Sequence, residues 1–520
     1  MLQNLKNIAV VSLSTVGSRL LGLLRDILIF AALGTSLWNS AFILAFTLPN
    51  LFRRLLGEGA LTSALVPVFS DIMEREGKAG AFRFFNQVVA RLFLALCLII
   101  TTGMLLLYGA SNAAWLPERW VTGAGLAVWL LPYMLCVCLA AIFSAGLNLL
   151  GRFAAAAVTP MLLNIAMIAA LAAGIWMDAE AARIVYWLCG GVLVGGLFQL
   201  LLPAVDFFRQ GWRPRVNFRK GEALGELWVL FIPGLMGAAI LQINILVSRL
   251  LAYSLDESAV SVLYLASRLM ELPLGVFTIA IATVFFPLLA KAQSTSDADG
   301  FANAFVQGIR LVAAISLPAG IGLIVLGRPI IESLFLWGAF DAGDVIATVP
   351  LLAIYGLGLP FYSIATFATR GLHARKDMRT PVRVALYCLL INFFAGISLM
   401  QIMGAAGLAA ANVMAAIAQS VLLWRSIARD QRSIGFYRLK SALGKVLLAA
   451  MIMGLVCFVI NAATAEFGFG QKVDAAMGVV VGVPTGVAVY MISLYFLRFE
   501  EFGMLKDLFR RFIPAPKKEN

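Results

Sequence analysis

The sequence predicts an all-α integral membrane protein, and three observations support this fold class. Of the 520 residues, 62% are hydrophobic and 13% are charged, whereas soluble chains have about 45–50% apolar and about 25% charged residues. The apolar residues lie in runs of about 20, the length of a helix that crosses a bilayer core. The sequence lacks the alternating apolar–polar segments of a membrane β-barrel, so helical spans are expected.

Fourteen apolar runs are expected to be transmembrane helices. They lie at about 8–34, 37–69, 82–109, 121–148, 154–176, 181–208, 224–254, 258–290, 305–327, 346–370, 381–403, 405–428, 441–463 and 474–497. Because this number is even, both termini are expected on the same side of the membrane.

The lysines and arginines predict which side that is. With the N-terminus inside, 29 of the 40 Lys and Arg lie in cytoplasmic segments and 4 lie in outer loops, while 7 lie within spans. Cytoplasmic loops of membrane proteins are enriched in Lys and Arg in this way. The sequence therefore predicts two cytoplasmic termini. The net charge of +13 is explained by basic loops on anionic lipid, without nucleic acid as a partner.

The chain resembles itself at an offset of about 220 residues. Three anchors share this offset: Pro67 with Pro287, Thr159-Pro160 with Thr380-Pro381, and Gln199 with Gln419. The offset shifts the chain by six spans, so the two copies run in the same direction across the membrane. Parallel repeats of this kind place a substrate site between two halves.

The repeat predicts two six-helix lobes around a central cavity, followed by two additional helices. The N-terminal lobe is expected at 1–220, the C-terminal lobe at 221–435, and the additional helices with a basic cytoplasmic tail at 436–520. Two lobes around a cavity favour alternating access over a fixed pore.

Ionisable side chains lie inside several predicted spans: Arg19, Arg25, Asp26, Arg53, Arg54, Glu58, Arg249, Arg268 and Glu271. An arginine at mid-bilayer costs about 2.5–3.5 kcal/mol on insertion scales, so such groups face a protein interior or a wet cavity. One interpretation is a set of internal salt bridges, because each of the three acids lies within pairing distance of an arginine.

The other interpretation is an anion site. Arginine exceeds acid in these spans, and its planar guanidinium binds phosphate oxygens and stays charged when dry. Arg19, Arg25 and Arg53 lie in the first lobe and Arg268 in the second. We favour an anion site between the lobes, with Asp26, Arg54, Glu58 and Glu271 as supporting residues.

Helix-breaking residues flank these charges at related places in the two halves. Pro49, Gly57 and Gly59 surround the arginine pair, and Pro273 and Gly275 follow Glu271. Breaks at matching positions of two repeats are typical of binding regions and hinges in transporters. The alternative is the ordinary occurrence of Gly and Pro in membrane helices.

Other polar residues receive plainer interpretations. Arg91 and Arg249 lie near helix ends, where a long side chain can reach water. His373, the only histidine, is expected in a solvated loop. The six cysteines lie in apolar runs and are expected to be core residues without disulfide, zinc or other metal-binding spacing. Enzyme chemistry is not indicated, because the sequence lacks a phosphate loop, a metal cluster and a catalytic nucleophile arrangement; no cofactor is expected.

Four stretches carry a family resemblance: "SRLLGLLRD" (18–26), "AFTLPNLFRRLLGEGALTSALVPVFS" (45–70), "GRFAAAAVTPMLLNIAMI" (151–168) and "SRLMELPLGVFTIAIATVFFPLL" (267–289). In these stretches the chain resembles the MurJ (MviN) lipid II flippases of the multidrug/oligosaccharidyl-lipid/polysaccharide exporter superfamily. The resemblance extends over nearly the whole chain, and the spacing of the proline–asparagine, double-arginine and EGA elements is specific to that family.

The resemblance implies a substrate, a site and a location. The substrate would be lipid II, an undecaprenyl diphosphate that carries a disaccharide pentapeptide, moved from the inner to the outer leaflet for peptidoglycan synthesis. Cavity arginines of the family correspond to Arg19, Arg25, Arg53 and Arg268, and the diphosphate would contact the last three. Spans 13 and 14 would form a groove for the lipid tail, and a lateral opening would lie between spans 1 and 8. The chain would be a monomer in the bacterial cytoplasmic membrane, surrounded by membrane lipids, with other cell-wall synthesis proteins as further candidate partners.

Two positions depart from the family pattern. Ser40 and Ser267 stand where family members often carry Asp, so a role given to those aspartates does not transfer to this chain. Three alternatives to a lipid II flippase remain open: an exporter of another polyprenyl-linked glycan or of a drug, a non-transporting scaffold of the cell-wall machinery, and an enzyme that acts on a lipid diphosphate.

Overall fold

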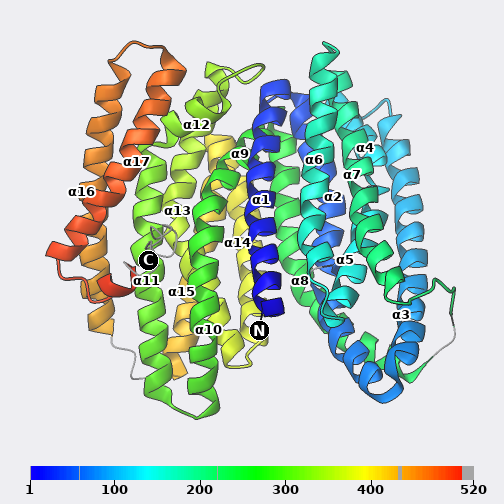
Figure 1. Ribbon diagram of the computed structural model, residues 1–520. Helices are drawn as coiled ribbons and strands as arrows, with labels where there is room; N and C mark the ends of the chain where they lie inside the picture. Colours follow the sequence, from blue (N-terminus) through cyan, green and yellow to red (C-terminus); the bar gives the residue numbers. More distant parts are fainter. Residues whose placement is uncertain (1, 58, 219–220, 431–435, 506–520) are drawn as a thin grey trace, which may run out of the picture. The chain divides into compact units, whose positions relative to one another are not determined.

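The computed structural model describes residues 2–57, 59–218, 221–430 and 436–505, and every regular element within these ranges is a helix (Figure 1). Its α-helices are α1 (Leu2–Leu33), α2 (Leu37–Phe52), α3 (Ala60–Ser111), α4 (Glu118–Leu130), α5 (Tyr133–Leu149), α6 (Ala154–Trp176), α7 (Ala181–Arg209), α8 (Glu222–Leu255), α9 (Ala259–Pro273), α10 (Ile279–Ser294), α11 (Ala298–Val325), α12 (Gly327–Phe335), α13 (Ala342–Ala374), α14 (Arg379–Met403), α15 (Ala405–Asp430), α16 (Phe436–Ala465) and α17 (Gln471–Phe496). Two π-helices, η1 (Arg53–Gly57) and η2 (Leu274–Thr278), lie between α2 and α3 and between α9 and α10.

The predicted class of all-α membrane protein is confirmed. Among the described residues, 11 helical stretches are long and apolar enough to cross a membrane, or up to 12 when α4 and α5, which are bent by 43°, count as one span. The stretch Leu37–Ser111 counts once among these, although the backbone turns sharply inside it at Gly77, with φ 68° and ψ −170°. The exact number of fourteen spans stays a prediction.

The chain divides into two compact units. The first contains Met1–Ser261 and Trp337–Asp341, and the second contains Val262–Leu336 and Ala342–Asn520. Helix α8 packs against α3, so packing groups α8 with the first unit, whereas the predicted C-terminal lobe begins at residue 221. The division into functional lobes at 1–220, 221–435 and 436–520 stays a prediction.

An aromatic cluster forms part of the core of the first unit. The ring of Phe85 lies 4.5 Å from that of Phe207 and 5.4 Å from that of Phe143, and Trp212 lies 5.2 Å from Phe143. A Cβ atom at Gly146 would lie 2.9 Å from the Phe207 ring, so the small residue lets α5 approach these rings closely. The cluster ties α3, α5 and α7 together next to the segment that follows α7.

A second core holds the second unit together. The ring of Phe305 lies 5.7 Å from those of both Phe367 and Trp424, and Phe285 lies 6.0 Å from Phe367. These rings come from α11, α13, α15 and α10, so the core joins four helices, of which only α10 and α11 are consecutive in the sequence.

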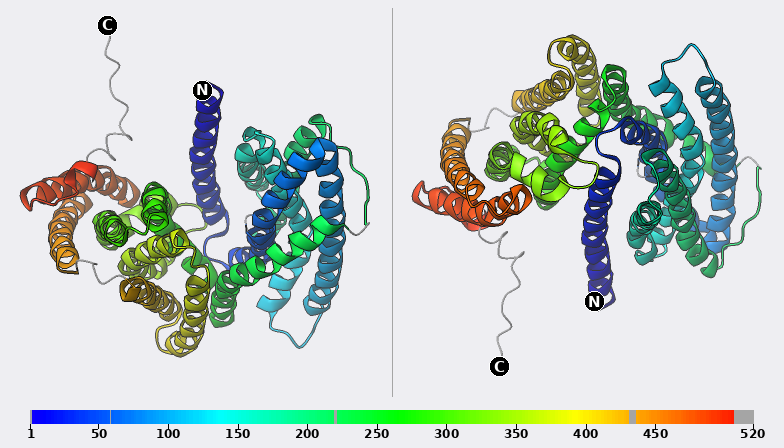
Figure 2. Two further views of the ribbon diagram at one scale, coloured as in Figure 1. Left: turned by 90° about the horizontal axis from the view of Figure 1, so that it is seen from below. Right: turned by 90° about the horizontal axis from the view of Figure 1, so that it is seen from above.

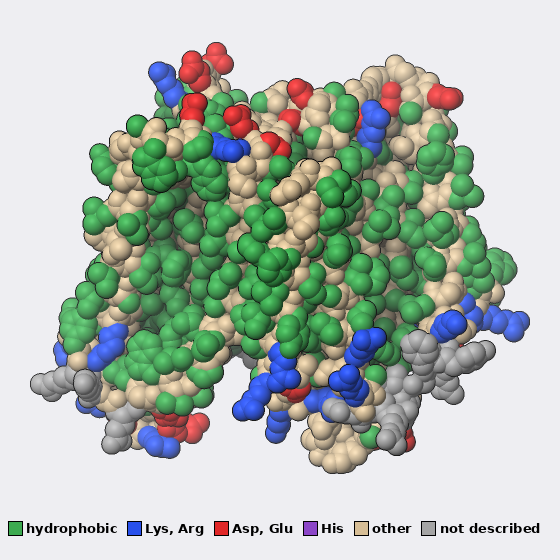
Figure 3. Space-filling model, turned by 180° about the vertical axis from the view of Figure 1, so that it is seen from behind, with side chains coloured by type: hydrophobic (Ala, Val, Ile, Leu, Met, Phe, Trp, Pro, Cys, Tyr) green, Lys and Arg blue, Asp and Glu red, His purple; other side chains and the backbone are tan. Residues whose placement is uncertain are grey.

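The outer surface is apolar over the middle of both units. On the face drawn in Figure 3, hydrophobic side chains cover the central band, and Lys and Arg gather along its lower edge. On α3, for example, Leu98, Leu105 and Leu106 are 68%, 69% and 71% exposed. Apolar side chains that face outward in this way are expected where lipid replaces water as the solvent.

Helices α16 and α17 lie side by side at one edge of the second unit (Figure 2), and polar contacts fix them to α11. The Tyr490 hydroxyl donates to the Ala314 carbonyl at 2.6 Å. After α17, Glu500 and Glu501 each accept a hydrogen bond of 2.7 Å from the Arg310 guanidinium. The Arg310 and Glu501 side chains are only 6% and 5% exposed, so this is an ion pair largely withdrawn from solvent.

The segment Trp337–Asp341, which we call the strap, belongs to the first unit although it lies between α12 and α13 of the second. The Ala339 amide donates to the Ala31 carbonyl at 2.7 Å, and the Phe340 ring packs edge-on against Phe30 at 5.7 Å. Gly338 has φ 63°, and a Cβ atom there would collide with the Ala31 carbonyl oxygen. The strap thus holds the end of α1 through contacts that only glycine permits at position 338.

Replacing Gly338 with alanine is expected to lower the free energy of unfolding by more than about 1 kcal/mol, because the left-handed backbone and the close Ala31 carbonyl both oppose a side chain. Thermal unfolding of the purified protein in detergent measures the change. Gly125→Ala in α4 is the matched control, because a Cβ atom at Gly125 meets no atom within 4 Å. An unfolding midpoint for Gly338→Ala equal to that of the control would contradict the role of the strap.

The turn between α13 and α14 is held by one carboxylate outside the apolar spans. Asp377 Oδ1 accepts from the amides of Thr380 and Arg379 at 3.0 Å and 3.1 Å. Burial raises the pKa of Asp377, but hydrogen bonds from Thr380 and Arg379 and the nearby Arg375 charge outweigh this effect, and the pKa falls below its ordinary value of 3.8. The carboxylate therefore stabilises the start of α14 above that value.

This stabilisation is expected to disappear as the pH falls through the lowered pKa of Asp377. Hydrogen exchange of the Thr380 amide, corrected for the intrinsic pH dependence of exchange, should show protection at pH 5 and its loss below pH 4. Asp377→Asn keeps a capping oxygen but cannot titrate, so its protection should not change over this range. Identical pH profiles for the two proteins would refute the assignment.

Candidate substrate-binding site

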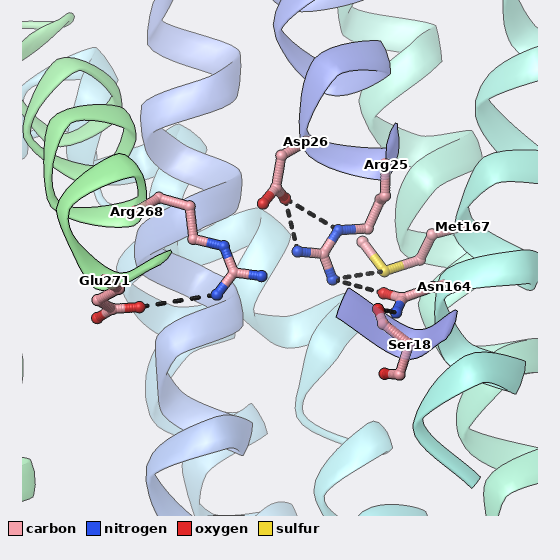
Figure 4. Close-up of polar contacts among 7 residues, drawn as sticks. All are labelled: Ser18, Arg25, Asp26, Asn164, Met167, Arg268 and Glu271. Carbon is pink, nitrogen blue, oxygen red and sulfur yellow. Dashed lines mark hydrogen bonds and ion pairs between the residues drawn. The ribbon is translucent and has the colours of Figure 1, made fainter. Parts of the chain in front are cut away.

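Arg25 lies in a prearranged polar contact between α1 and α6 (Figure 4). Its guanidinium binds Asp26 Oδ1 at 2.6 Å and 3.1 Å and donates to Asn164 Oδ1 at 3.0 Å. Asn164 in turn donates to the Ser18 carbonyl at 3.1 Å. The Arg25 and Asp26 side chains are 11% and 1% exposed. The predicted pairing of Arg25 with Asp26 is therefore present, and a short, buried contact of this kind holds the guanidinium in place.

The sequence analysis did not identify Asn164 as part of this contact. The only available signal was a polar side chain within the apolar run 154–176. Because Asn164 lies 139 residues from Arg25, only the packing of α1 on α6 brings the two together. Arg19, six residues before Arg25 on α1, is exposed.

Arg53 and Arg54 open the π-helix η1 (Arg53–Gly57). Arg53 is half-buried and its Nε donates to Asn50 Oδ1 at 3.3 Å, whereas Arg54 is exposed. Asn50 also donates to the Phe46 carbonyl at 2.9 Å, so Asn50 is itself held in place where it accepts from Arg53. The predicted pairing of Arg54 with Glu58 falls on Glu58, which lies outside the described residues.

Arg268 lies on α9 one turn before Glu271 (Figure 4). The distance from Arg268 Nη1 to Glu271 Oε2 is 3.7 Å, and the two side chains are 34% and 53% exposed. A long, partly hydrated ion pair contributes little to stability. The predicted pairing of Arg268 with Glu271 is therefore present but weak.

The predicted helix breaks coincide with the two π-helices. Pro49 lies in α2 and Gly57 ends η1, while Pro273 ends α9 and Gly275 lies within η2. The two π-helices start at residues 53 and 274, an offset of 221, which matches the offset of the sequence repeat. π-Helical turns interrupt regular hydrogen bonding and are frequent at functional sites. Their role as hinges stays a prediction.

Gly59 shows why a glycine is needed beside η1. A Cβ atom at Gly59 would lie 2.6 Å from the Arg54 carbonyl oxygen and 3.0 Å from that of Leu55. Any larger residue would therefore push the start of α3 away from the π-helix.

Ser40 and Ser267, the two departures from the family pattern, have different surroundings. Ser40 is fully buried, and its hydroxyl donates to Ser261 Oγ at 3.2 Å. The two residues are also 221 positions apart, so equivalent places of the repeat contact each other directly. Ser267 donates to the Tyr264 carbonyl of its own helix at 2.9 Å. Ser40 thus makes a neutral, dry contact, where an ionised carboxylate would have to be desolvated.

Arg91 and Arg249, interpreted from the sequence as side chains near helix ends that can reach water, also make specific contacts with the protein. Arg249 on α8 donates to the Thr47 hydroxyl of α2, and Arg91 donates to the carbonyls of Asn217 and Phe218 at 3.2 Å and 2.8 Å. Both guanidiniums bind neutral oxygens of neighbouring segments, because packing offered each a partner closer than bulk water.

The charged side chains described above suit an anion better than a metal ion. No group of three His, Cys, Asp or Glu among them is placed to hold a metal ion. Half-buried guanidiniums within apolar helices are suited to oxyanions, since they remain charged and supply several donors.

Comparison with known proteins assigns this architecture to a family. The family model described as "Lipid II flippase MurJ" matches residues 29–499. A probable lipid II flippase MurJ of Rhizobium meliloti (strain 1021) is 35% identical over 466 residues, which cover 87% of this chain and 86% of the relative. A protein of the same description from Vibrio cholerae is 31% identical over 529 residues and covers 97% of each chain.

Solved structures agree with the sequence relatives. A structure described as lipid II flippase MurJ in an inward closed conformation is 25% identical, covers 94% of this chain and 98% of its own, and superposes with a TM-score of 0.78. An inward-facing multidrug transporter of the MATE family shares the fold at 14% identity and a TM-score of 0.64, with 80% of this chain covered.

Proposed function

The chain belongs to the lipid II flippase MurJ family, and on this premise we propose that it carries lipid II from the inner to the outer leaflet of the bacterial cytoplasmic membrane for cell-wall synthesis. The protein is a transporter and not an enzyme. The observation that carries the proposal is the match of the family model over residues 29–499, a range that includes the arginines Arg53 and Arg268 in apolar helices.

We propose that Arg53 and Arg268 contact the diphosphate of lipid II directly. The support is that Arg53 begins the π-helix η1 and is only half-buried, and that the Arg268 side chain, in the matching region of the repeat, is 34% exposed, so neither guanidinium is closed off from a phosphate group. Arg25 is bound to Asp26 at 2.6 Å, which holds its guanidinium in one orientation. Its proposed role is to donate hydrogen bonds to the substrate from this fixed position. Arg19, which is exposed on α1, is the fourth arginine proposed to bind the head group.

The cycle is proposed to be alternating access, with the head group in the cavity and the polyprenyl tail in lipid. An inside-negative potential drives an anion outward by about 2.3 kcal/mol per charge per 100 mV, so the diphosphate moves down the electrical gradient. The empty, positively charged site returns inward under the same field. The π-helices η1 and η2 are the proposed hinges, because their irregular hydrogen bonding lets the helix axis change at low cost.

The tail is proposed to lie along α16 and α17. This placement of the tail is supported by the large apolar side chains that these two helices expose. Among them, Leu455, Phe458 and Val480 are 65%, 60% and 71% exposed. We further propose that both termini are cytoplasmic, as the Lys and Arg distribution predicts, and that the chain acts as a monomer.

Complementation tests the proposal. A bacterial strain depleted of its own lipid II flippase should regain growth and lipid II delivery to the outer leaflet when this chain is expressed. Failure of a well-expressed chain to restore delivery would overturn the function. Restored delivery of a different polyprenyl-linked glycan but not of lipid II would identify an exporter of that glycan instead.

A further inference from the structure

The first unit carries a cavity that the transport site does not use. It lies between α6 and α7, at the end of the pair where α6 begins and α7 ends, and its volume is about 670 Å³. Pockets that hold small molecules usually measure about 300–1,000 Å³. The cavity is therefore large enough to take up part of a ligand the size of a lipid.

The walls of this cavity are apolar. Leu162, Phe198, Leu201 and Val205 line it, and the last three are 51%, 45% and 46% exposed. Within helices that cross a membrane, such side chains open toward hydrocarbon and not toward water. An acyl chain of a neighbouring lipid is the group that this wall fits.

Two opposite charges stand at the mouth. Asp206 and Arg209 both line the cavity and lie about one turn apart at the C-terminal end of α7. Neither belongs to the ion pairs formed among the described side chains. Arg152, next to the start of α6, donates at 2.8 Å to the Gln210 side chain when that amide is oriented to accept, so a second cation lies near the same end.

We propose that this cavity binds a phospholipid with an ethanolamine head group. One acyl chain lies between α6 and α7, the phosphate accepts from Arg209, and the ammonium group donates to Asp206. A head group that carries one negative and one positive charge matches an arginine and an aspartate one turn apart. A phosphatidylglycerol head group would offer Asp206 neutral hydroxyls in place of a cation, and a polyprenyl diphosphate would offer it a second anionic phosphate.

Native mass spectrometry of the purified, delipidated full-length protein tests this site. Dioleoyl phosphatidylethanolamine, dioleoyl phosphatidylglycerol and undecaprenyl diphosphate are added separately and then in competition. In competition, the protein is expected to retain at least five times as much phosphatidylethanolamine as phosphatidylglycerol. Asp206→Asn should abolish this preference. Val158 also lines the cavity, and Val158→Trp, which fills it, should lower retention of both phospholipids at least five-fold.

The control variant lies on the same two helices, α6 and α7. Asp178→Asn combined with Arg183→Gln removes the same two charges at the other end of α6 and α7, where both residues are exposed, and should retain lipid as the unmodified protein does. Equal retention of the two phospholipids, unchanged retention in Val158→Trp, or displacement of both by undecaprenyl diphosphate would each overturn the proposal. An unchanged unfolding midpoint of Asp206→Asn separates loss of the site from loss of the fold.

Discussion

Replacing Arg53 or Arg268 with alanine is expected to lower lipid II delivery about 10- to 100-fold and to abolish complementation of a flippase-depleted strain. Hydrogen bonds to a charged group contribute about 1.5–3 kcal/mol, and each arginine is proposed to make such bonds to the diphosphate. Among the contacts of the described residues, Arg53 donates to Asn50 and Arg268 pairs with Glu271 at 3.7 Å, and a partly hydrated pair of this length contributes little to stability. The measurement is accessibility of lipid II at the outer leaflet, normalised to protein in the membrane.

Two matched variants sharpen this test. Arg54→Ala removes the adjacent, exposed arginine and should retain near-normal delivery, which separates direct contact from loss of charge in η1. Glu271→Gln removes the carboxylate charge that pairs with Arg268 and should leave delivery intact or raise it. Full delivery by both Arg53→Ala and Arg268→Ala would refute the arginine site while leaving the family assignment untouched.

Replacing Arg310 with glutamine is expected to reduce the free energy of unfolding by about 3–5 kcal/mol. The change leaves a buried carboxylate charge without its cationic partner. Arg310 binds Glu500 and Glu501 at 2.7 Å each, and Glu501 is 5% exposed. Arg310 Nε and Glu501 Oε2 already lack a hydrogen-bond partner, so little else compensates the loss. Thermal unfolding in detergent measures the change.

A double variant and a surface control make the second result decisive. Arg310→Gln combined with Glu501→Gln removes the stranded charge as well and should recover more than half of the lost stability. Arg83→Gln breaks the exposed pair with Glu76, whose members are 71% and 56% exposed, and should cost less than about 1 kcal/mol. An equal effect of Arg310→Gln and Arg83→Gln would show that the Arg310 contact is not a buried ion pair.

The sequence predicted those features that depend on composition and local spacing. Apolar runs located the helices, and adjacent acids located the partners of Arg25 and Arg268, which lie one and three residues away. The repeat offset also anticipated where η1 and η2 lie. Such features follow from solvent and from short-range geometry, so they need no knowledge of the packed chain.

Features that depend on long-range packing were not predicted. Asn164 reaches Arg25 across 139 residues, and Glu501 reaches Arg310 across 191. The grouping of α8 with the first unit and the contacts of Arg249 with α2 also depend on which helices become neighbours. No local pattern distinguishes an arginine that will meet water from one that will meet the carbonyl or hydroxyl of another helix.

The strap also has a consequence for biosynthesis. The first unit includes Trp337–Asp341, whereas its main part ends at Ser261, so the ribosome must add 80 more residues before this unit has all of its parts. At about 5–20 residues per second this takes about 4–16 s. During that interval the end of α1 lacks the amide of Ala339 and the ring of Phe340. The first unit is therefore expected to remain incomplete until Val262–Leu336 of the second unit has been synthesised.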